Sequence, residues 1–241
     1  MNTFSYKPIH NQDESGSSAF LSDLRNSTKV TRMISWDKRL PKHIEFMMKL
    51  HEHVYRTLYK NCDPSEFAFN DTGDGYLCVF WDKLHALTAL RQAIYVQKFL
   101  DQNLQLHNKT LDLQDSPVSL SYGIGIHSGG STINRTSYDS RNKSIEKDFI
   151  FGIVVNTVAR LESFTKNYTE CNFLVTGNYK DVFRNQAPSD SLKSLFEDNS
   201  PHLRHSLARV NLNDGKKGGH IVYGLTQDSI RLFTERFKVG P

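Results

Sequence analysis

The chain has only three cysteines among its 241 residues, and none of them forms a Cys-x-x-Cys pair. This pattern argues against a disulfide framework or a cysteine zinc site, so we expect reduced thiols in a cytoplasmic protein. Long apolar stretches are also missing, because the longest, 76–81 and 149–155, are too short to cross a bilayer. Residues 1–18 are polar and lack the apolar core of a signal peptide. We therefore expect a soluble protein with no membrane partner.

A strong excess of charge of either sign is missing too. The 30 basic and 26 acidic residues leave a net charge of +4, and no long basic run is present. This balance argues against nucleic acid as the main partner. Apolar residues make up 38% of the chain and aromatic residues 11%, which is enough for a packed core. The length suits one domain with additions.

The apolar periodicity predicts an α+β fold. Helical spacing recurs over 42–60, and two short strands joined by Thr-Gly-Asp-Gly follow it. The resulting order is βαββαβ, a ferredoxin-like core, followed by αβ and β-hairpin additions, with the helices on one side of the sheet. The predicted strands are 19–24, 67–72, 76–81, 119–129, 171–177, 206–212 and 219–225, and the predicted helices are 42–60, 83–103, 152–166 and 178–184.

The polar segments set the expected domain limits. Residues 1–18 are predicted to be a flexible arm, 19–226 the main domain, and 227–241 a C-terminal tail. The polar stretch 131–148 is either a loop or an extended hairpin arm.

Three short motifs carry the chemistry, at 20–28, 70–80 and 151–163. In the first, Asp23 ends an apolar run, and in the second, Asp74 lies in a glycine-rich hairpin turn. The third places Asn156 and Arg160 four residues apart, so that both side chains leave one face of a helix. Each has a simple structural explanation alone, as a cap, a turn or a solvated helix face. Together they suit the binding of a metal-bound polyphosphate.

In this order the motifs resemble those of class III nucleotidyl cyclases, the catalytic domain of adenylate and guanylate cyclases. The resemblance extends from about residue 19 to 225. The matching residues are Phe20 and Asp23 with the turn ending at Thr28, Gly73-Asp74-Gly75 with Phe80, Gly125-Ile126-His127-Ser128-Gly129, and Gly152, Val155, Asn156, Ala159, Arg160, Leu161 and Glu162. The resemblance implies that 19–226 is a cyclase catalytic domain.

The resemblance also implies how the substrate is held. Asp23, Asp74 and the backbone carbonyl of Leu24 would bind two divalent cations, Mg²⁺ or Mn²⁺, which prefer hard oxygen ligands. The ribose 3′-oxygen would attack the α-phosphorus, and pyrophosphate would leave. The triphosphate would contact the turn at the start of a helix, that is, Asn26, Ser27 and Thr28.

Further roles concern residues that come from later in the chain. Arg160 would stabilise charge on the α-phosphate, and Asn156 would orient the ribose. Either Lys216 or Lys217, in the last hairpin, would contact the phosphates. Family sites lie between two subunits, so the implied assembly is a homodimer with shared active sites, and the arm 131–148 is a candidate to reach the partner.

The chain departs from the family at the base-recognition positions. Adenylate cyclases usually pair a Lys, three residues before the hairpin glycine, with an Asp, Thr or Ser three before the helix-motif glycine, whereas guanylate cyclases use Glu and Cys. This chain has Asn70 and Phe149 there. An amide can pair with several base edges, whereas a phenyl ring can only fill space or stack. The bulky ring favours a smaller base, CTP or UTP.

This combination resembles the cytidylate and uridylate cyclases of bacterial Pycsar antiphage systems, whose cyclic nucleotide product activates a separate effector. Alternatives are an adenylate cyclase in which Asp148 serves in place of Phe149, a catalytically silent nucleotide-binding dimer, and a polymerase-like palm. We expect structural roles for His127 and Cys78.

Overall fold

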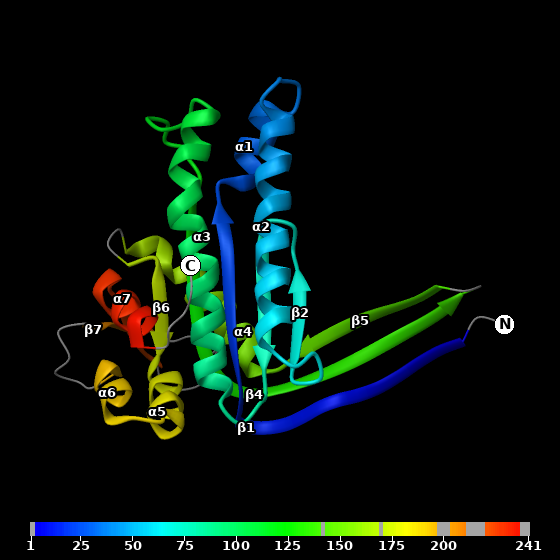
Figure 1. Ribbon diagram of the computed structural model, residues 1–241, viewed down its shortest axis with the longest axis vertical. Coiled ribbons are helices and arrows are strands. Elements are labelled where there is room, and N and C mark those ends of the chain that lie inside the picture. The colour runs from blue at the N-terminus through cyan, green and yellow to red at the C-terminus, as the bar shows by residue number, and fades with distance from the viewer. Residues whose placement is uncertain (1–2, 141–142, 169–170, 197–202, 211–219, 237–241) are drawn as a thin grey trace.

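The computed structural model describes residues 3–140, 143–168, 171–196, 203–210 and 220–236. In this part of the chain one eight-stranded sheet has the order β2-β3-β1-β4-β6-β8-β7, with β5 paired to β4 (Figure 1). The strands are β1 (Thr3–Arg25), β2 (Phe67–Asp71), β3 (Gly75–Phe80), β4 (Ser121–Ser140), β5 (Lys143–Phe151), β6 (Phe173–Thr176), β7 (Leu203–Val210) and β8 (His220–Leu225). The helices are α1 (Ser27–Ile34), α2 (Leu40–Asn61), α3 (His85–Thr110), α4 (Ile153–Phe164), α5 (Gly177–Gln186), α6 (Asp190–Lys193) and α7 (Gln227–Arg236), with 3₁₀ turns η1 (Thr165–Asn167) and η2 (Ser194–Phe196).

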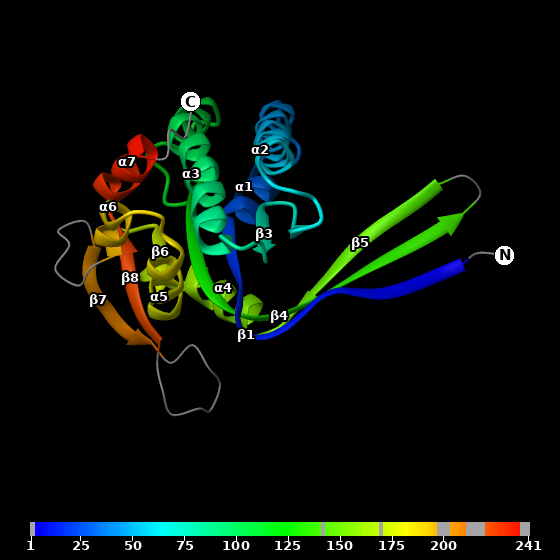
Figure 2. The ribbon, with the colours of Figure 1, turned by 60° about the horizontal axis from the view of Figure 1, so that its bottom comes forward.

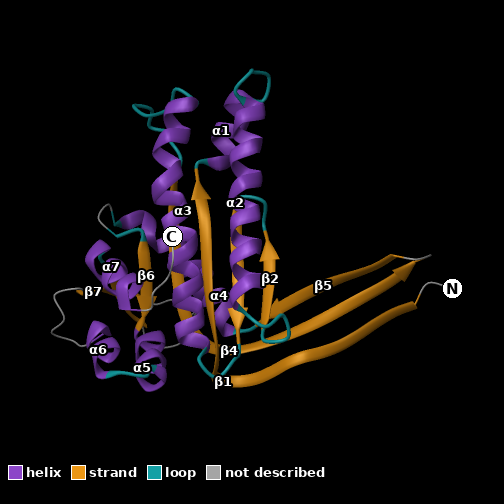
Figure 3. Cartoon of the chain, in the orientation of Figure 1, coloured by secondary structure: helices purple, strands orange, loops and turns teal. Residues whose placement is uncertain are grey.

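The predicted α+β class and the βαββαβ core are confirmed (Figure 3). Strands β2, β3, β1 and β4 are neighbours in that order and pair antiparallel. Strand β6 then joins β4 in parallel, and the β7–β8 hairpin extends the sheet beyond it. The additions predicted after the core are therefore present.

Helices cover both faces of the sheet, which corrects the expectation that they lie on one side. Phe20 of β1 packs in the main core with residues of α2 and α3, whereas its neighbour Ala19 packs with Val154 and Val158 of α4. Strand alternation thus gives β1 two buried faces. Gly125 of β4 lets α4 approach closely, because a Cβ there would lie 2.9 Å from the carbonyl oxygen of Val158.

A three-stranded extension, which we call the arm, projects from the core (Figure 2). It consists of the first half of β1, the second half of β4, and β5. Of the two alternatives for 131–148, the extended hairpin is the one that forms. The stretch 1–18, expected to be a flexible arm, lies in β1 from Thr3 onward. Pairing with β4 along one edge holds this polar stretch in a strand without any apolar pattern.

Two further differences concern element ends. Helix α3 continues to Thr110, beyond the predicted limit of 103. The predicted tail 227–241 begins with α7, whose Ile230 and Phe233 are buried in the main core. Across the described ranges, no helix has the length and apolar character needed to span a membrane.

Candidate active site

Two aspartates from separate elements meet at the end of β1. Asp23 lies opposite Gly75 of β3, and a Cβ on Gly75 would be only 2.9 Å from Oδ1 of Asp23. Asp74 is in the turn between β2 and β3, where its carbonyl oxygen accepts a hydrogen bond from the N–H of Leu24 at 3.0 Å. Gly73 has a φ of 95°, a backbone conformation that favours glycine. The structure therefore brings the two predicted metal-binding aspartates together.

The charge of Asp23 is costly in the metal-free protein. Burial and, second, the negative charge of Asp74 together raise the pKa of Asp23 to about 6. Lys166 and Arg25 act in the opposite direction without cancelling the effect. A cation placed between the two carboxylates would relieve both the burial cost and the repulsion.

The oxygen ligands at this site suit a small, hard cation that keeps part of its hydration shell. In the ranges that the structure describes, no group of three or more His, Cys, Asp or Glu side chains is placed to hold a metal. Mg²⁺ takes one or two carboxylates and completes its octahedron with waters and phosphate oxygens. Asp23, Asp74 and the carbonyl of Leu24 would form such a partial set. The site thus suits a cation that arrives with a phosphate ligand.

The predicted phosphate turn lies in the same cleft. Asn26 adopts the left-handed conformation, with φ 64° and ψ 3°, and its Nδ2 donates to the carbonyl oxygen of Ser119 at 2.9 Å. This hydrogen bond fixes the turn from which α1 starts. The cleft has a volume of about 540 Å³ and is lined by Asp23, Leu24, Arg25, Asn26, Ser27, Thr28, Lys29, Asp74, Ser121 and Lys166. It combines two carboxylates with cationic side chains and a helix N-terminus.

Next to Asp23, the half-buried Arg25 and the buried Thr165 and Glu162 form a polar cluster that was not anticipated from the sequence. Arg25 donates a hydrogen bond to Oγ1 of Thr165, which in turn donates to the carbonyl oxygen of Glu162 at 2.6 Å. Burial and, second, the charge of Asp23 together raise the pKa of Glu162 to about 7. Burial lowers the pKa of Arg25. Lys166, which also lines the cleft, counteracts both raised carboxyl pKa values.

This cluster has room to form only because residue 123 of β4 is a glycine. A Cβ on Gly123 would lie 2.6 Å from Nη2 of Arg25, and closer still to Oγ1 of Thr165 and Oε1 of Glu162. Within the described part of the chain, Oε1 of Glu162 is buried without a hydrogen-bond partner. Glu162 closes the helix motif, and Gly123 opens the glycine pattern of β4. Both positions belong to motifs that were recognised in the sequence, but only the fold shows that Glu162 lies against Gly123.

Helix α4 separates the Asn/Arg pair from the aspartates of the same chain. Its inward face buries Val158 and Glu162 against the sheet. Asn156 lies on the outward face and is exposed, as is Ile153, which is 60% exposed. Arg160 shares that outward face because it follows Asn156 by four residues. Neither Asn156 nor Arg160 lines the cleft of the aspartates.

The two predicted base-recognition residues are placed differently. Asn70 lines a pocket between β2 and the base of the arm, together with Asp148. Phe149 does not line this pocket. Its ring is 40% exposed and lies under the ammonium group of Lys147, 5.6 Å from the ring centroid.

The remaining predictions have separate outcomes. Lys216 and Lys217 lie outside the described residues. His127 is buried and shares a hydrogen bond of 2.8 Å between its Nδ1 and Oγ1 of Thr176, and Cys78 is fully buried. Both environments are those of structural residues.

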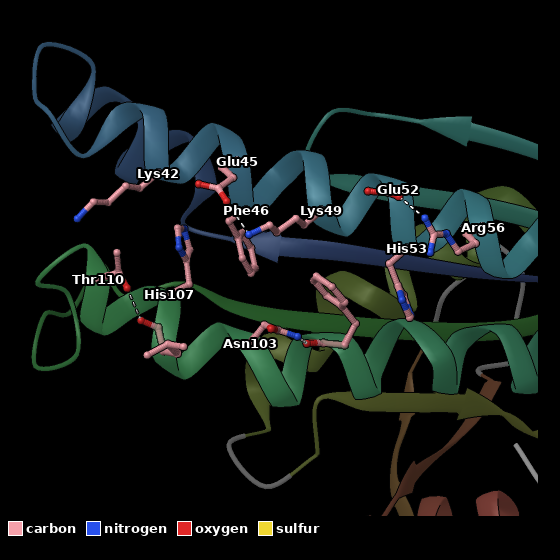
Figure 4. A pocket seen from close by; sticks show the side chains of 12 residues that line it. Lys42, Glu45, Phe46, Lys49, Glu52, His53, Arg56, Asn103, His107 and Thr110 are labelled. Carbon is pink, nitrogen blue, oxygen red and sulfur yellow. Dashed lines mark hydrogen bonds and ion pairs between the residues drawn. The ribbon is translucent and has the colours of Figure 1, made fainter. Parts of the chain in front are cut away.

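A groove of about 540 Å³ between α2 and α3 contains none of the predicted site residues (Figure 4). His107 lies at its floor, where it stacks on Phe46 with a centroid distance of 4.1 Å and shares a 3.1 Å hydrogen bond with His43. Burial lowers the pKa of His107 to about 4, so this contact joins neutral rings at physiological pH.

Comparison with known proteins gives structural matches only. No protein-family model and no curated protein sequence matches this chain. A bacterial light-regulated adenylyl cyclase has a TM-score of 0.59 at 16% identity, over 97% of this chain and 57% of that protein. The adenylyl cyclase CyaB from P. aeruginosa has a TM-score of 0.56 at 15% identity, over 93% of this chain and 96% of that one. The guanylyl cyclase Cya2 has a TM-score of 0.54 at 18% identity, over 90% and 94%.

These matches establish the fold. The chain has the fold of the adenylyl and guanylyl cyclase structures, as predicted. It spans just over half the length of the light-regulated adenylyl cyclase and nearly all of the other two.

Proposed function

We propose that this chain is a nucleotidyl cyclase that converts a ribonucleoside triphosphate to a 3′,5′-cyclic nucleotide and pyrophosphate. The observation that carries the proposal is the meeting of Asp23 and Asp74 beside the first turn of α1. Carboxylates next to a helix N-terminus suit a metal-bound triphosphate. The shared fold with adenylyl and guanylyl cyclases supports the same reaction type.

The reaction needs little covalent chemistry from the protein. Asp23, Asp74 and the carbonyl of Leu24 would hold two divalent cations, Mn²⁺ or Mg²⁺, which lower the pKa of the ribose 3′-hydroxyl and neutralise phosphate charge when bound. The turn at Ser27 and Thr28 binds the triphosphate. The 3′-oxygen attacks the α-phosphorus, the bond to the β-phosphate breaks, pyrophosphate leaves, and the hydroxyl proton passes to solvent.

The active site is shared between two copies of the chain. Asn156 and Arg160 lie on the outward face of α4, where a second protomer can present its aspartates to them. Arg160 then donates to the α-phosphate, Asn156 orients the ribose, and Lys216 or Lys217 contacts the phosphates. Loss of one such preorganised donor typically lowers the rate by about 10²–10³.

Mixing two inactive variants tests the shared site. Asp74→Ala and Arg160→Ala each remove one half, so a mixed dimer contains one intact site and one doubly defective site. We expect activity to reappear when the two proteins are unfolded together and refolded, but not when either is treated alone. Absence of recovery, with mixed dimers demonstrated by mass, would contradict a shared site.

We also propose that the base is a pyrimidine. Asn70 lines the pocket at the base of the arm, and its amide is suited to a variable base edge. Because Phe149 does not line that pocket, the proposal is supported by Asn70 and by the family resemblance. Purified protein is incubated with Mn²⁺ and each of the four ribonucleotides in turn, and the cyclic product is identified by mass. Turnover of ATP alone would make the protein an adenylate cyclase. Binding without any turnover would leave a silent nucleotide-binding module.

The cellular role we propose is antiphage signalling through cyclic CMP or cyclic UMP, which a separate effector would bind. Cells carrying the wild-type chain should accumulate the cyclic pyrimidine after phage infection, and cells carrying Asp74→Ala should not. An unchanged level after infection would contradict this role.

A further inference from the structure

The turn that carries Asp74 has little restraint of its own. Gly73 and Gly75 flank the aspartate, and glycine loses more conformational freedom on folding than any other residue. One backbone hydrogen bond closes the turn, from the N–H of Thr72 to the carbonyl oxygen of Gly75 at 3.0 Å. A second joins Asp74 to Leu24 of β1. Further contacts that restrict the backbone between these two points therefore help to hold the Asp74 carboxylate in one place.

Asp71, the last residue of β2, supplies such a contact. Its Oδ1 accepts a hydrogen bond from the N–H of Gly73 at 2.7 Å, which is the pattern by which an aspartate stabilises a turn two residues further on. Its other oxygen, Oδ2, lies 2.6 Å from Nδ1 of His51 on α2. An ionised carboxylate only accepts hydrogen bonds, so Nδ1 of His51 is the donor. One carboxylate thus joins the turn to a helix from an earlier part of the chain.

The imidazole of His51 is held against the sheet by aromatic neighbours. The ring of Tyr55, one helical turn further along α2, lies 4.5 Å from it between centroids, and the ring of Tyr76 lies 6.1 Å away. Tyr76 is buried in the main core, and its backbone pairs with that of Asp71. Figure 1 shows α2 running alongside β2. His51 also lines the groove of about 1100 Å³ that Asp74 borders, so the helix and the turn are close on this side.

We propose that His51 and Asp71 are positioning residues of the metal site, which fix the turn of Asp74 against α2. This inference rests on the proposed function, because it assigns the pair a part in binding the divalent cations. Within the described part of the chain, neither side chain lines the cleft of the aspartates, so the pair acts through the backbone of Gly73 and not as a ligand. The side chains of His51 and Asp71 are 42% and 26% exposed, and exposed pairs add little to the free energy of unfolding. Their main effect is therefore on the placement of the turn.

Removing the imidazole tests the assignment. His51→Leu removes the donor on α2 and leaves the hydrogen bond between Asp71 and Gly73 in place. We expect the dissociation constant for Mn²⁺ to rise by about tenfold, the lower end of the loss caused by removing a residue that orients a metal ligand. Calorimetric titration of the metal-free protein with Mn²⁺ measures it, and the urea unfolding curve should change little. His51→Asn should restore most of the affinity, because its Nδ2 can donate in place of Nδ1.

A second background shows whether His51 acts through Asp71. Asp71→Ala removes both contacts of the carboxylate, so adding His51→Leu to it should cause no further loss of Mn²⁺ affinity. This comparison also keeps the test decisive if one single variant folds poorly. The control is Arg56→Leu on the same helix, which breaks an exposed ion pair with Glu52 and lines the groove between α2 and α3. It should keep the Mn²⁺ affinity of the wild type.

The outcomes separate this inference from the proposed function. Equal Mn²⁺ affinity in the wild type and His51→Leu would overturn the inference and leave the cyclase standing, and so would a further loss in the Asp71→Ala background. The titration contains no nucleotide. A chain that binds Mn²⁺ but cyclises no nucleotide would therefore contradict the proposed function, and the same variants would still decide the inference. A wild type without affinity for Mn²⁺ would overturn both.

Discussion

The N–H of Leu24 donates a hydrogen bond to the carbonyl oxygen of Asp74, 3.0 Å away, and so ties the end of β1 to the β2–β3 turn. The two aspartates are therefore positioned by backbone pairing and not by their own side chains. This arrangement leaves both carboxylates available to a cation.

Replacing Gly75 should disturb the metal site, because its Cβ would lie against the side chain of Asp23. A Cβ there would lie 2.9 Å from Oδ1 of Asp23 and 2.9 Å from the backbone oxygen of Ser22, which cannot move without the strand. We expect Gly75→Ala to weaken Mn²⁺ binding by about tenfold to a hundredfold, the range in which a change beside a metal ligand lowers affinity. Calorimetric titration with Mn²⁺ measures the effect.

The matched control is the neighbouring glycine of the same turn. A Cβ on Gly73 would meet nothing within 4 Å, but its φ of 95° strains any other residue. Gly73→Ala should therefore cost about 1–3 kcal/mol of stability and retain Mn²⁺ affinity. Equal losses of affinity in the two variants would contradict the contact with Asp23.

Divalent cations should stabilise the folded chain through the two aspartates. Mn²⁺ at 100 times its dissociation constant should add about 2.7 kcal/mol to the free energy of unfolding, seen as a rise in Tm. Asp74→Asn should remove most of this rise. Asp112→Asn makes the same change in another turn, at a φ of 56° that Asn tolerates, and should keep it. A rise that survives in Asp74→Asn would place the cation elsewhere.

The cluster behind Asp23 should be intolerant of extra volume at Gly123. A Cβ added to Gly123 would overlap the side chains of Arg25, Thr165 and Glu162. We expect Gly123→Ala to lower the free energy of unfolding by about 1–3 kcal/mol, as overpacking of a buried site does. Urea unfolding provides the value. Gly177→Ala is the control, because its Cβ would have ordinary contacts at 3.7 Å, and it should be close to neutral.

Glu162 should make the metal-free protein less stable as the pH rises. Its pKa is about 7 in the folded chain against an ordinary value of 4.5, so the folded state binds more protons than the unfolded state between these values. The contribution of Glu162 to stability is therefore most favourable below pH 4.5 and falls as the pH rises to 7. Glu162→Gln removes this pH-dependent contribution to stability, because glutamine does not titrate.

The comparison of wild type with Glu162→Gln is made by urea unfolding at pH 5 and pH 8, in the absence of metal. The variant should gain stability relative to the wild type between the two values, because only the wild type has to bury a charge at pH 8. A difference in unfolding free energy that is the same at both values would show that burial of the Glu162 charge is not costly.

Much of the fold was predictable because the core elements carry their own patterns. The 3.6-residue period of α2 and the glycine-rich turn between β2 and β3 identified those elements within a few residues. The first half of β1 was not predictable, because it is polar and its partners in β4 are more than a hundred residues away. A polar strand of this kind forms because it pairs with another strand, here β4, and the local sequence does not show which segment that partner is.

The candidate site divides in the same way. Asp23, Asp74, Asn156 and Arg160 were recognisable as a set from their spacing and from the family resemblance. The proximity of Glu162 to Asp23 and Arg25 was not, since it requires α4 to cross β4 at Gly123 and Gly125. The sequence left Phe149 and Asp148 as alternatives at the pocket of Asn70, and only the structure gives this place to Asp148, because a one-residue difference in a strand changes the face on which a side chain lies.

The amino-acid sequence by itself determined the class of fold, the elements of the core and the residue types available for the chemistry, because periodicity and turn composition act over short distances. The tertiary structure alone decided which of these residues meet. It joined Asp23 to Asp74, directed Asn156 and Arg160 away from them, and gave Asp148 instead of Phe149 to the pocket of Asn70. The physical reason is that strand register and helix packing are set by contacts between segments far apart in the chain, and each contact selects one face of the element it touches.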